Sequence, residues 1–208
     1  MAKVFRDTVS GWTHVGGAIA SVVGTIFLSM TGNSAAKMAA YIIFGMSMIL
    51  LFSASGTYHL ITKESIVRAF RKVDHAMIFV MIAGTYTPLI LKAFSGSPRM
   101  WYMLGIWLFA LSGVSLKIFF AGRFRLFSTI IYLAMGWTCI FAIKPIIEAL
   151  GPGGSLLLLG GGVFYTVGGV FYALKWPRKG KKFGFHEVFH ILILLGAISM
   201  YFMVYFYL

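Results

Sequence analysis

Long apolar blocks separated by short polar segments dominate the chain. A helix that crosses the hydrocarbon layer of a bilayer needs about 20 predominantly apolar residues, and the chain offers seven such blocks. They predict an all-α integral membrane protein, a bundle of seven transmembrane helices. The loops between them are short, so residues 1–208 are expected to form a single domain. The blocks lie near residues 12–30, 38–60, 76–91, 101–121, 127–147, 155–174 and 187–207.

Composition supports a membrane protein and argues against a nucleic-acid binder. The chain is 60% hydrophobic, whereas soluble domains are about half apolar. The net charge of +13 would suit a nucleic-acid partner, but the basic residues fall between the apolar blocks, where they orient a membrane protein. No nucleic-acid partner is therefore expected. The sole cysteine, Cys139, has no partner for an internal disulfide, so cysteine usage does not indicate a redox compartment.

The distribution of Lys and Arg predicts the orientation. Cytoplasmic loops carry the excess of these residues. With seven crossings, the N-terminus shares one side with the second, fourth and sixth loops. That side holds fourteen of the basic residues and the other side four, so we expect a cytoplasmic N-terminus, an outside C-terminus and a multi-pass protein of the cell membrane. The fourteen are Lys3, Arg6, Lys63, Arg68, Arg71, Lys72, Lys117, Arg123, Arg125, Lys175, Arg178, Lys179, Lys181 and Lys182.

All five histidines fall at the cytoplasmic ends of the predicted helices. His186 and His190 are four apart, so both lie on one helix face, with Cβ atoms about 6 Å apart, and both can reach one metal ion. His59, four residues after Ser55, offers a third nitrogen from the second helix. Three protein ligands and an open position are typical of catalytic zinc.

Acidic residues near these histidines suggest further roles. Asp74 is placed to hold or deprotonate a water molecule at such a metal, or to pair with a neighbouring basic residue. His75 follows it about 100° around the helix and is expected to point elsewhere. Glu187 is expected to cap a helix or pair with a loop lysine. His14 either supports a metal ligand through a hydrogen bond or packs between helices, and the HxxxH pair could simply face water at the interface.

Five segments together resemble the haemolysin III family, the bacterial branch of the progestin and adiponectin receptor family, within a wider group of membrane hydrolases that includes alkaline ceramidases. The resemblance spans nearly the whole chain and rests on SxxxH, Asp and HxxxH in that order. The segments are FRDTVSGWTH (5–14), SASGTYH (53–59), KVDHAMIFVMIAGTYTP (72–88), YLAMGW (132–137) and FHEVFH (185–190).

The resemblance implies seven helices and a zinc ion (Zn2+) held by His59, His186 and His190, with Ser55 and Asp74 near the metal or its water. His14 matches the end of the family's first motif, Glu-x-x-Asn-x-x-Thr-His. In this chain Asp7 replaces the Glu and Ser10 the Asn, which removes the hydrogen bonds that an Asn side chain would make. Met77 stands where the receptors have a small residue.

Three functions are consistent with these residues. The first is a zinc-dependent intramembrane hydrolase that cleaves an amide or ester of a membrane lipid near the cytoplasmic leaflet, with Asp74 and Ser55 as catalytic residues. The second is a non-catalytic regulator or sensor of membrane state, in which zinc staples the helices. The third is a pore-forming haemolysin, although the sequence shows no continuous polar stripe. The oligomeric state is left open.

Overall fold

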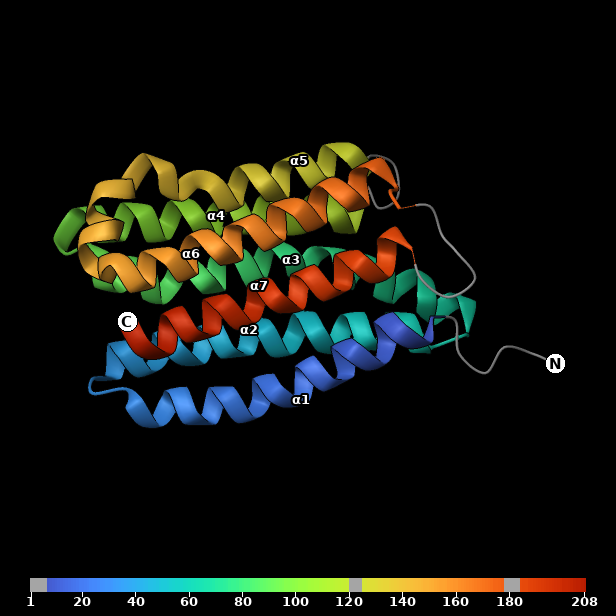
Figure 1. Ribbon diagram of the computed structural model, residues 1–208, viewed down its shortest axis with the longest axis horizontal. Helices are drawn as coiled ribbons and strands as arrows, with labels where there is room; N and C mark the ends of the chain where they lie inside the picture. The colour runs from blue at the N-terminus through green and yellow to red at the C-terminus, as the bar shows by residue number, and fades with distance from the viewer. Residues whose placement is uncertain (1–6, 120–124, 178–183) are drawn as a thin grey trace.

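The protein is a bundle of helices. The computed structural model describes residues 7–119, 125–177 and 184–208, and every regular element in these residues is helical. Figure 1 shows the helices running side by side along one axis, with the start of α1 at one end of the bundle and the end of α7 at the other. In chain order the elements are α1 (Thr8–Thr31), α2 (Ala35–Leu60), α3 (Glu64–Ala93), α4 (Gly96–Phe119), α5 (Arg125–Gly136), the 3-10 helix η1 (Trp137–Ala142), α6 (Ile143–Leu174) and α7 (Phe185–Tyr207).

Six stretches of the described chain are long and apolar enough to cross a membrane, where the sequence predicted seven. The difference lies in Leu126–Leu174, a 49-residue stretch in which α5, η1 and α6 follow one another without a gap. Within α6 the backbone leaves helical geometry at Gly151, with φ 62° and ψ −175°. The break falls between the apolar blocks expected near 127–147 and 155–174. Figure 1 shows α6 running back alongside α5.

The third helix begins much earlier than expected. The apolar pattern placed its start near residue 76, but α3 starts at Glu64. The first turns are charged, which excludes them from an apolar block, yet Glu, Lys and Arg are good helix formers. Arg68 Nη1 lies 3.7 Å from Glu64 Oε2 one turn earlier.

Seven of the basic residues used to predict orientation lie outside the described residues: Lys3, Arg6, Arg123, Arg178, Lys179, Lys181 and Lys182.

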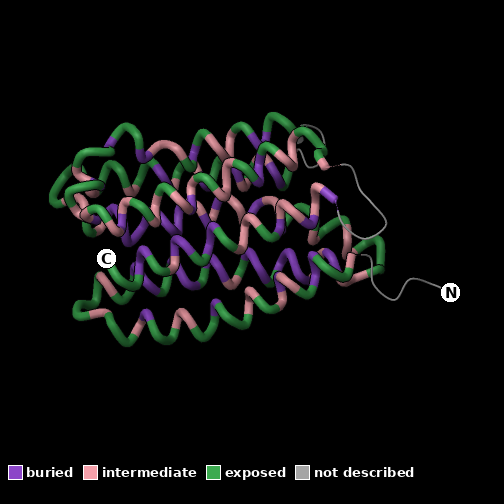
Figure 2. The backbone as a smooth tube through the Cα atoms, in the orientation of Figure 1, coloured by how far each residue is buried: buried purple, intermediate pink, exposed green. Residues whose placement is uncertain are grey.

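Small residues allow the helices on one side to approach closely. A side chain on Gly45 of α2 would overlap Thr25 of α1, and one on Gly84 of α3 would overlap Ser47 of α2. Such small residues are typical of helix contacts in membranes, where they let backbones come together. Figure 2 shows that buried residues concentrate on the inner faces, while exposed residues cover the periphery. The exposed residues include many large apolar side chains, which suits contact with lipid.

Candidate metal site and cavity

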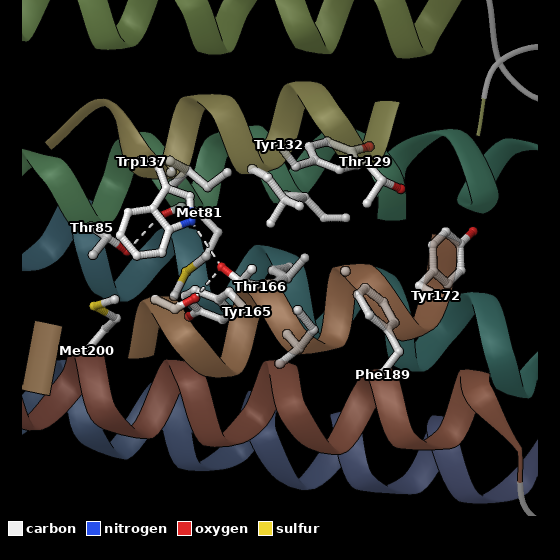
Figure 3. Close-up of a pocket in the computed structure, with 18 of the residues that line it drawn as sticks. Met81, Thr85, Thr129, Tyr132, Trp137, Tyr165, Thr166, Tyr172, Phe189 and Met200 are labelled. Atoms are coloured by element: carbon white, nitrogen blue, oxygen red, sulfur yellow. Dashed lines mark hydrogen bonds between the residues drawn. The ribbon is translucent and has the colours of Figure 1, made fainter. Parts of the chain in front are cut away.

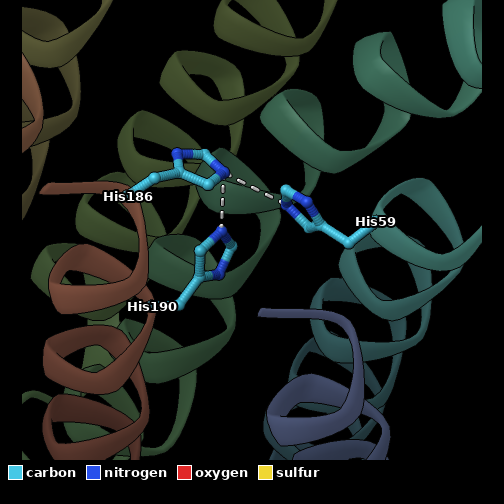
Figure 4. A group of neighbouring side chains, drawn as sticks. All are labelled: His59, His186 and His190. Carbon is cyan, nitrogen blue, oxygen red and sulfur yellow. Dashed lines mark hydrogen bonds between the residues drawn. The ribbon is translucent and has the colours of Figure 1, made fainter. Parts of the chain in front are cut away.

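Three histidine side chains converge at one end of the bundle (Figure 4). His186 Nε2 lies 3.4 Å from His59 Nε2 and 3.2 Å from His190 Nε2. One ligand atom from each of the three residues lies within 4.8 Å of the other two. The structure therefore brings together the three residues that were predicted from the sequence to be metal ligands.

The separations fit a tetrahedral zinc ion. Zinc binds imidazole nitrogen at about 2.0–2.1 Å, so two nitrogens at a tetrahedral centre lie about 3.3–3.4 Å apart. The two Nε2–Nε2 distances, 3.2 and 3.4 Å, are close to this value. His59 and His190 are almost fully buried. The donor set is therefore suited to a divalent metal ion with three protein ligands.

Local sequence fixes the helix ends that carry these ligands. His59 is in the last turn of α2, and His186 and His190 are in the first two turns of α7. The N–H of Gly184 donates to Glu187 Oε2 at 2.8 Å, which satisfies one of the free donors at the start of α7. The expectation that Glu187 caps this helix is confirmed.

Two of the histidines have partners on their far nitrogens. His190 Nδ1 is 2.9 Å from His14 Nε2, within hydrogen-bond distance. His59 Nδ1 is 3.5 Å from Asp7 Oδ2, which is an ion-pair contact and not a hydrogen bond. A metal-bound histidine usually directs its second nitrogen to such a group, which fixes the ring orientation. When His190 Nε2 binds a metal, its Nδ1 carries the proton and donates to His14 Nε2, which also lies 3.4 Å from the His190 carbonyl.

Asp7 is a residue whose position at the site was not predicted from the sequence. It caps α1, accepting from the N–H of Ser10 at 3.4 Å, and its own N–H donates to the carbonyl of His59 at 3.1 Å. Its place at the Glu position of the family's first motif was the available signal. Ser10, at the Asn position, is fully buried, and its Oγ has no hydrogen-bond partner among the described residues.

Ser55, Asp74 and His75 line the cavity next to the histidines. The Oγ of Ser55 is buried and makes no hydrogen bond within the described part of the chain. Asp74 is buried, with Oδ2 4.0 Å from His75 Nε2. His75 is not part of the metal-binding group, as expected, but it lines the same cavity as Asp74.

The cavity extends from the histidines into the bundle between α3, α5, α6 and α7. Its volume is about 560 Å³, within the range of roughly 300–1,000 Å³ that is usual for ligand sites. It reaches Met200, ten residues beyond His190 on α7, about 15 Å along a helix. Figure 3 shows Met81, Trp137, Tyr165 and Phe189 among its lining, so a polar end opens into a largely apolar interior.

Comparison with known proteins places the chain in a family. The model of haemolysin-III related proteins matches residues 2–201. "Hemolysin-3 homolog" of Bacillus subtilis (strain 168) is 37% identical over 212 residues, covering 100% of this chain and 96% of that protein. "Hemolysin-3" of Bacillus cereus is 39% identical over 209 residues, covering 98% and 92%.

A more distant relative is human "Monocyte to macrophage differentiation factor", 24% identical over 169 residues, which cover 75% of this chain and 70% of that protein. No solved structure gives a significant match. The family match spans nearly the whole chain, and the described helices are long and apolar enough to cross a bilayer repeatedly. The chain is therefore a multi-pass integral membrane protein that belongs to the haemolysin-III related family.

Proposed function

We propose that the protein is a zinc-dependent intramembrane hydrolase that cleaves an amide or ester bond of a membrane lipid. One observation carries the proposal: three imidazole nitrogens converge, and two of their residues, His186 and His190, line the polar end of an apolar cavity that extends into the bundle. A lipid fits this arrangement because its tail can occupy the apolar part while a carbonyl lies near the histidines. The bilayer then supplies the substrate directly.

We also propose that the whole chain forms one seven-crossing domain with its N-terminus in the cytoplasm. A straight helix of the 49 residues in Leu126–Leu174 would be about 70 Å long, far more than the roughly 30 Å of the hydrocarbon core. The break at Gly151 supports two crossings in this stretch. The start of α1 and the end of α7 lie at opposite ends of the bundle in Figure 1, which supports an odd total. The histidines then lie toward the cytoplasmic leaflet.

The residues of the site divide the work. His59, His186 and His190 would hold the zinc, which when bound polarises a carbonyl and makes water more acidic. Asp74 accepts the proton of the attacking water on its carboxylate, and later delivers it to the leaving group. Ser55 has a free hydroxyl beside the histidines, suited to orient that water or the substrate carbonyl. The apolar cavity excludes other water.

The number of ligands favours catalysis over a structural staple. Structural zinc is usually closed by four protein ligands, whereas catalytic zinc keeps a position open. Within the described residues the metal-binding group contains three side chains, and Asp74 is not one of them.

The names of the Bacillus relatives suggest lysis, but a pore needs a polar path. The inner part of the cavity, with Ile147, Leu158 and Met200, is apolar.

Metal analysis is the first test. Purified, tag-free protein in detergent should contain about one zinc per chain by mass spectrometry, and His59→Ala, His186→Ala and His190→Ala should each lose it. Zinc-free wild type would overturn the proposal. Zinc that survives His59→Ala would exclude α2 as a source of ligand.

Hydrolysis is the second test, with a long-chain amide and a long-chain ester as substrates. Asp74→Asn should keep its zinc and lose about 10²–10⁴-fold in rate, the usual contribution of a general base. Zinc-loaded wild type without hydrolysis of either bond would favour the staple. Zinc-independent leakage from liposomes that contain the protein would favour the pore.

A further inference from the structure

The cavity contains a buried cation that the proposed chemistry does not use. Lys117, in the last turn of α4, is only 7% exposed and lines the cavity. Its Nζ donates to Ser128 Oγ at 2.5 Å and lies 5.5 Å from the centre of the Tyr132 ring. An ammonium group carries three donors, so further hydrogen-bonding capacity remains after the contact with Ser128.

No carboxylate of the described residues forms an ion pair with Lys117. The chain has five acidic residues, all of which the structure describes. Arg71 lines the cavity as well and adds positive charge. A cation at this depth is costly when uncompensated, and such residues in membrane proteins usually face a partner or a functional cavity.

The cation shares one end of the cavity with the histidines. Tyr132, whose ring lies beside Lys117, donates its hydroxyl to the carbonyl of His75 at 2.8 Å. His75, Lys117 and Tyr132 all line this part of the cavity. This end therefore has an imidazole wall formed by His14 of α1 and by His186 and His190 of α7. Across from it, on α3, α4 and α5, is a cationic wall formed by Arg71, Lys117 and Ser128. Beyond both walls the lining is mainly apolar, and Figure 3 shows Tyr132 and Thr129 on the α5 side of that lining.

We propose that the cationic wall binds the anionic head group of a lipid, a carboxylate or a phosphate, whose tail occupies the apolar cavity. The inference rests on the proposed function in one respect: the cavity receives the lipid substrate. A lysine ammonium is a compact point charge that suits such oxygen anions, and hydrogen bonds between charged groups are short and strong. The substrate class is then an anionic lipid whose scissile bond lies close to its charged group.

Binding to the purified full-length chain in a neutral detergent tests the inference. The probes share a chain length: laurate, dodecyl phosphate and dodecanol, with inorganic phosphate as a tail-free anion. Lys117→Met removes the charge and keeps the length, Lys117→Arg keeps the charge, and Lys72→Met is the matched control. Lys72 is an exposed cation at the same end that donates to the carbonyl of Ile118 at 3.0 Å and does not line the cavity.

Wild type should bind laurate or dodecyl phosphate more tightly than dodecanol. Lys117→Met should lower the affinity for the anionic probe by about ten- to a hundredfold, which is the contribution of a hydrogen bond to a charged group. The affinity for dodecanol should not change. Lys117→Arg and Lys72→Met should stay close to wild type. Equal binding of the charged and neutral probes, or unchanged anion binding in Lys117→Met, would overturn the inference. Inorganic phosphate that binds as tightly as dodecyl phosphate would exclude a lipid as the source of the anion.

Two more readouts separate this inference from the hydrolase proposal. Removal of an unbalanced buried charge should raise the unfolding temperature of ligand-free Lys117→Met, whereas a purely structural lysine would lower it. Zinc content should not change in this variant. Conversely, the His186→Ala variant, which should lose its zinc, should still bind laurate or dodecyl phosphate more tightly than dodecanol. A wild-type protein that binds the anionic probe but contains no zinc would overturn the hydrolase proposal and leave the head-group site in place.

Discussion

The two sides of the bundle are built differently. On the side that holds the histidines, α1, α2 and α7 are in close contact: a Cβ on Gly17 would lie 2.8 Å from Leu194 and 3.2 Å from Phe52. On the side of α5, η1 and the face of α6 toward them, a Cβ on Gly136 would meet nothing within 4 Å, and one on Gly162 would reach only Trp137, at 4.0 Å. Another face of α6 packs closely on α7, where a Cβ on Gly161 would lie 2.7 Å from Met200. Metal ligands need fixed positions, whereas a lipid tail needs space, and the two sides match these two demands.

Hydrogen bonds keep the open side in shape. The hydroxyl of Tyr86 donates to the carbonyl of Gly136 at 2.7 Å and accepts from the N–H of Cys139 at 2.8 Å, which holds α3 against η1. Trp137 Nε1 donates to Thr166 Oγ1 at 3.0 Å, which joins η1 to α6 (Figure 3). Individual polar contacts thus take the place of close packing around the cavity.

A large side chain introduced on the closely packed side is the strongest test of this difference in packing. Gly45→Leu should force α1 and α2 apart at Thr25 and lower the free energy of unfolding by about 1–3 kcal/mol or more, with partial loss of zinc. Thermal unfolding in detergent, together with metal content, measures both. Gly105→Leu is the matched control, because nothing lies within 4 Å of a Cβ there. Equal effects of the two substitutions would mean that the sides do not differ in packing.

Weakening the support of one ligand should have the next largest effect. Asp7→Asn should keep the cap of α1, since Asn caps as well as Asp, but should lower zinc affinity by about 10–100-fold because His59 loses its carboxylate partner. Competition with a chelator measures the affinity. Ser34→Ala, which removes the corresponding cap of α2, should leave the zinc affinity unchanged. An Asp7→Asn protein with wild-type affinity would limit Asp7 to capping.

On the open side, Tyr86→Phe should affect stability without affecting the metal. The N–H of Cys139 and the carbonyl of Gly136 lose a buried partner, which costs about 1–3 kcal/mol. Chemical unfolding followed by tryptophan fluorescence can show this decrease. Zinc content should equal that of wild type, and a drop in zinc would show that the two sides are coupled through α3.

Filling the cavity should have the smallest effect on stability. Gly162→Leu places a side chain in open space, so unfolding should change by about 0.5 kcal/mol or less and zinc should be retained. Binding of long-chain lipids should fall while shorter chains still bind. Measurement of affinity against chain length checks this prediction, and a curve that matches wild type would place the tail elsewhere.

Periodicity and local spacing predicted the parts of the molecule that depend on near neighbours in sequence. The helical segments, the cap by Glu187 and the shared face of His186 and His190 all arise within a few residues. The approach of Asp7 to His59 joins the start of α1 to the end of α2, so only the packed fold reveals it. Lys117 reads in sequence as one more basic residue beside a loop, and its burial against Ser128 depends on how α4 meets α5.

The order in which the three histidines are synthesised also has a consequence. His59 leaves the ribosome with the second helix, but His186 and His190 belong to the last one. Under the proposed function, the growing chain can acquire its zinc only after all the other helices have been made. Metal uptake would then report that biogenesis is complete, and a chain truncated before residue 184 would remain apo even if it reached the membrane.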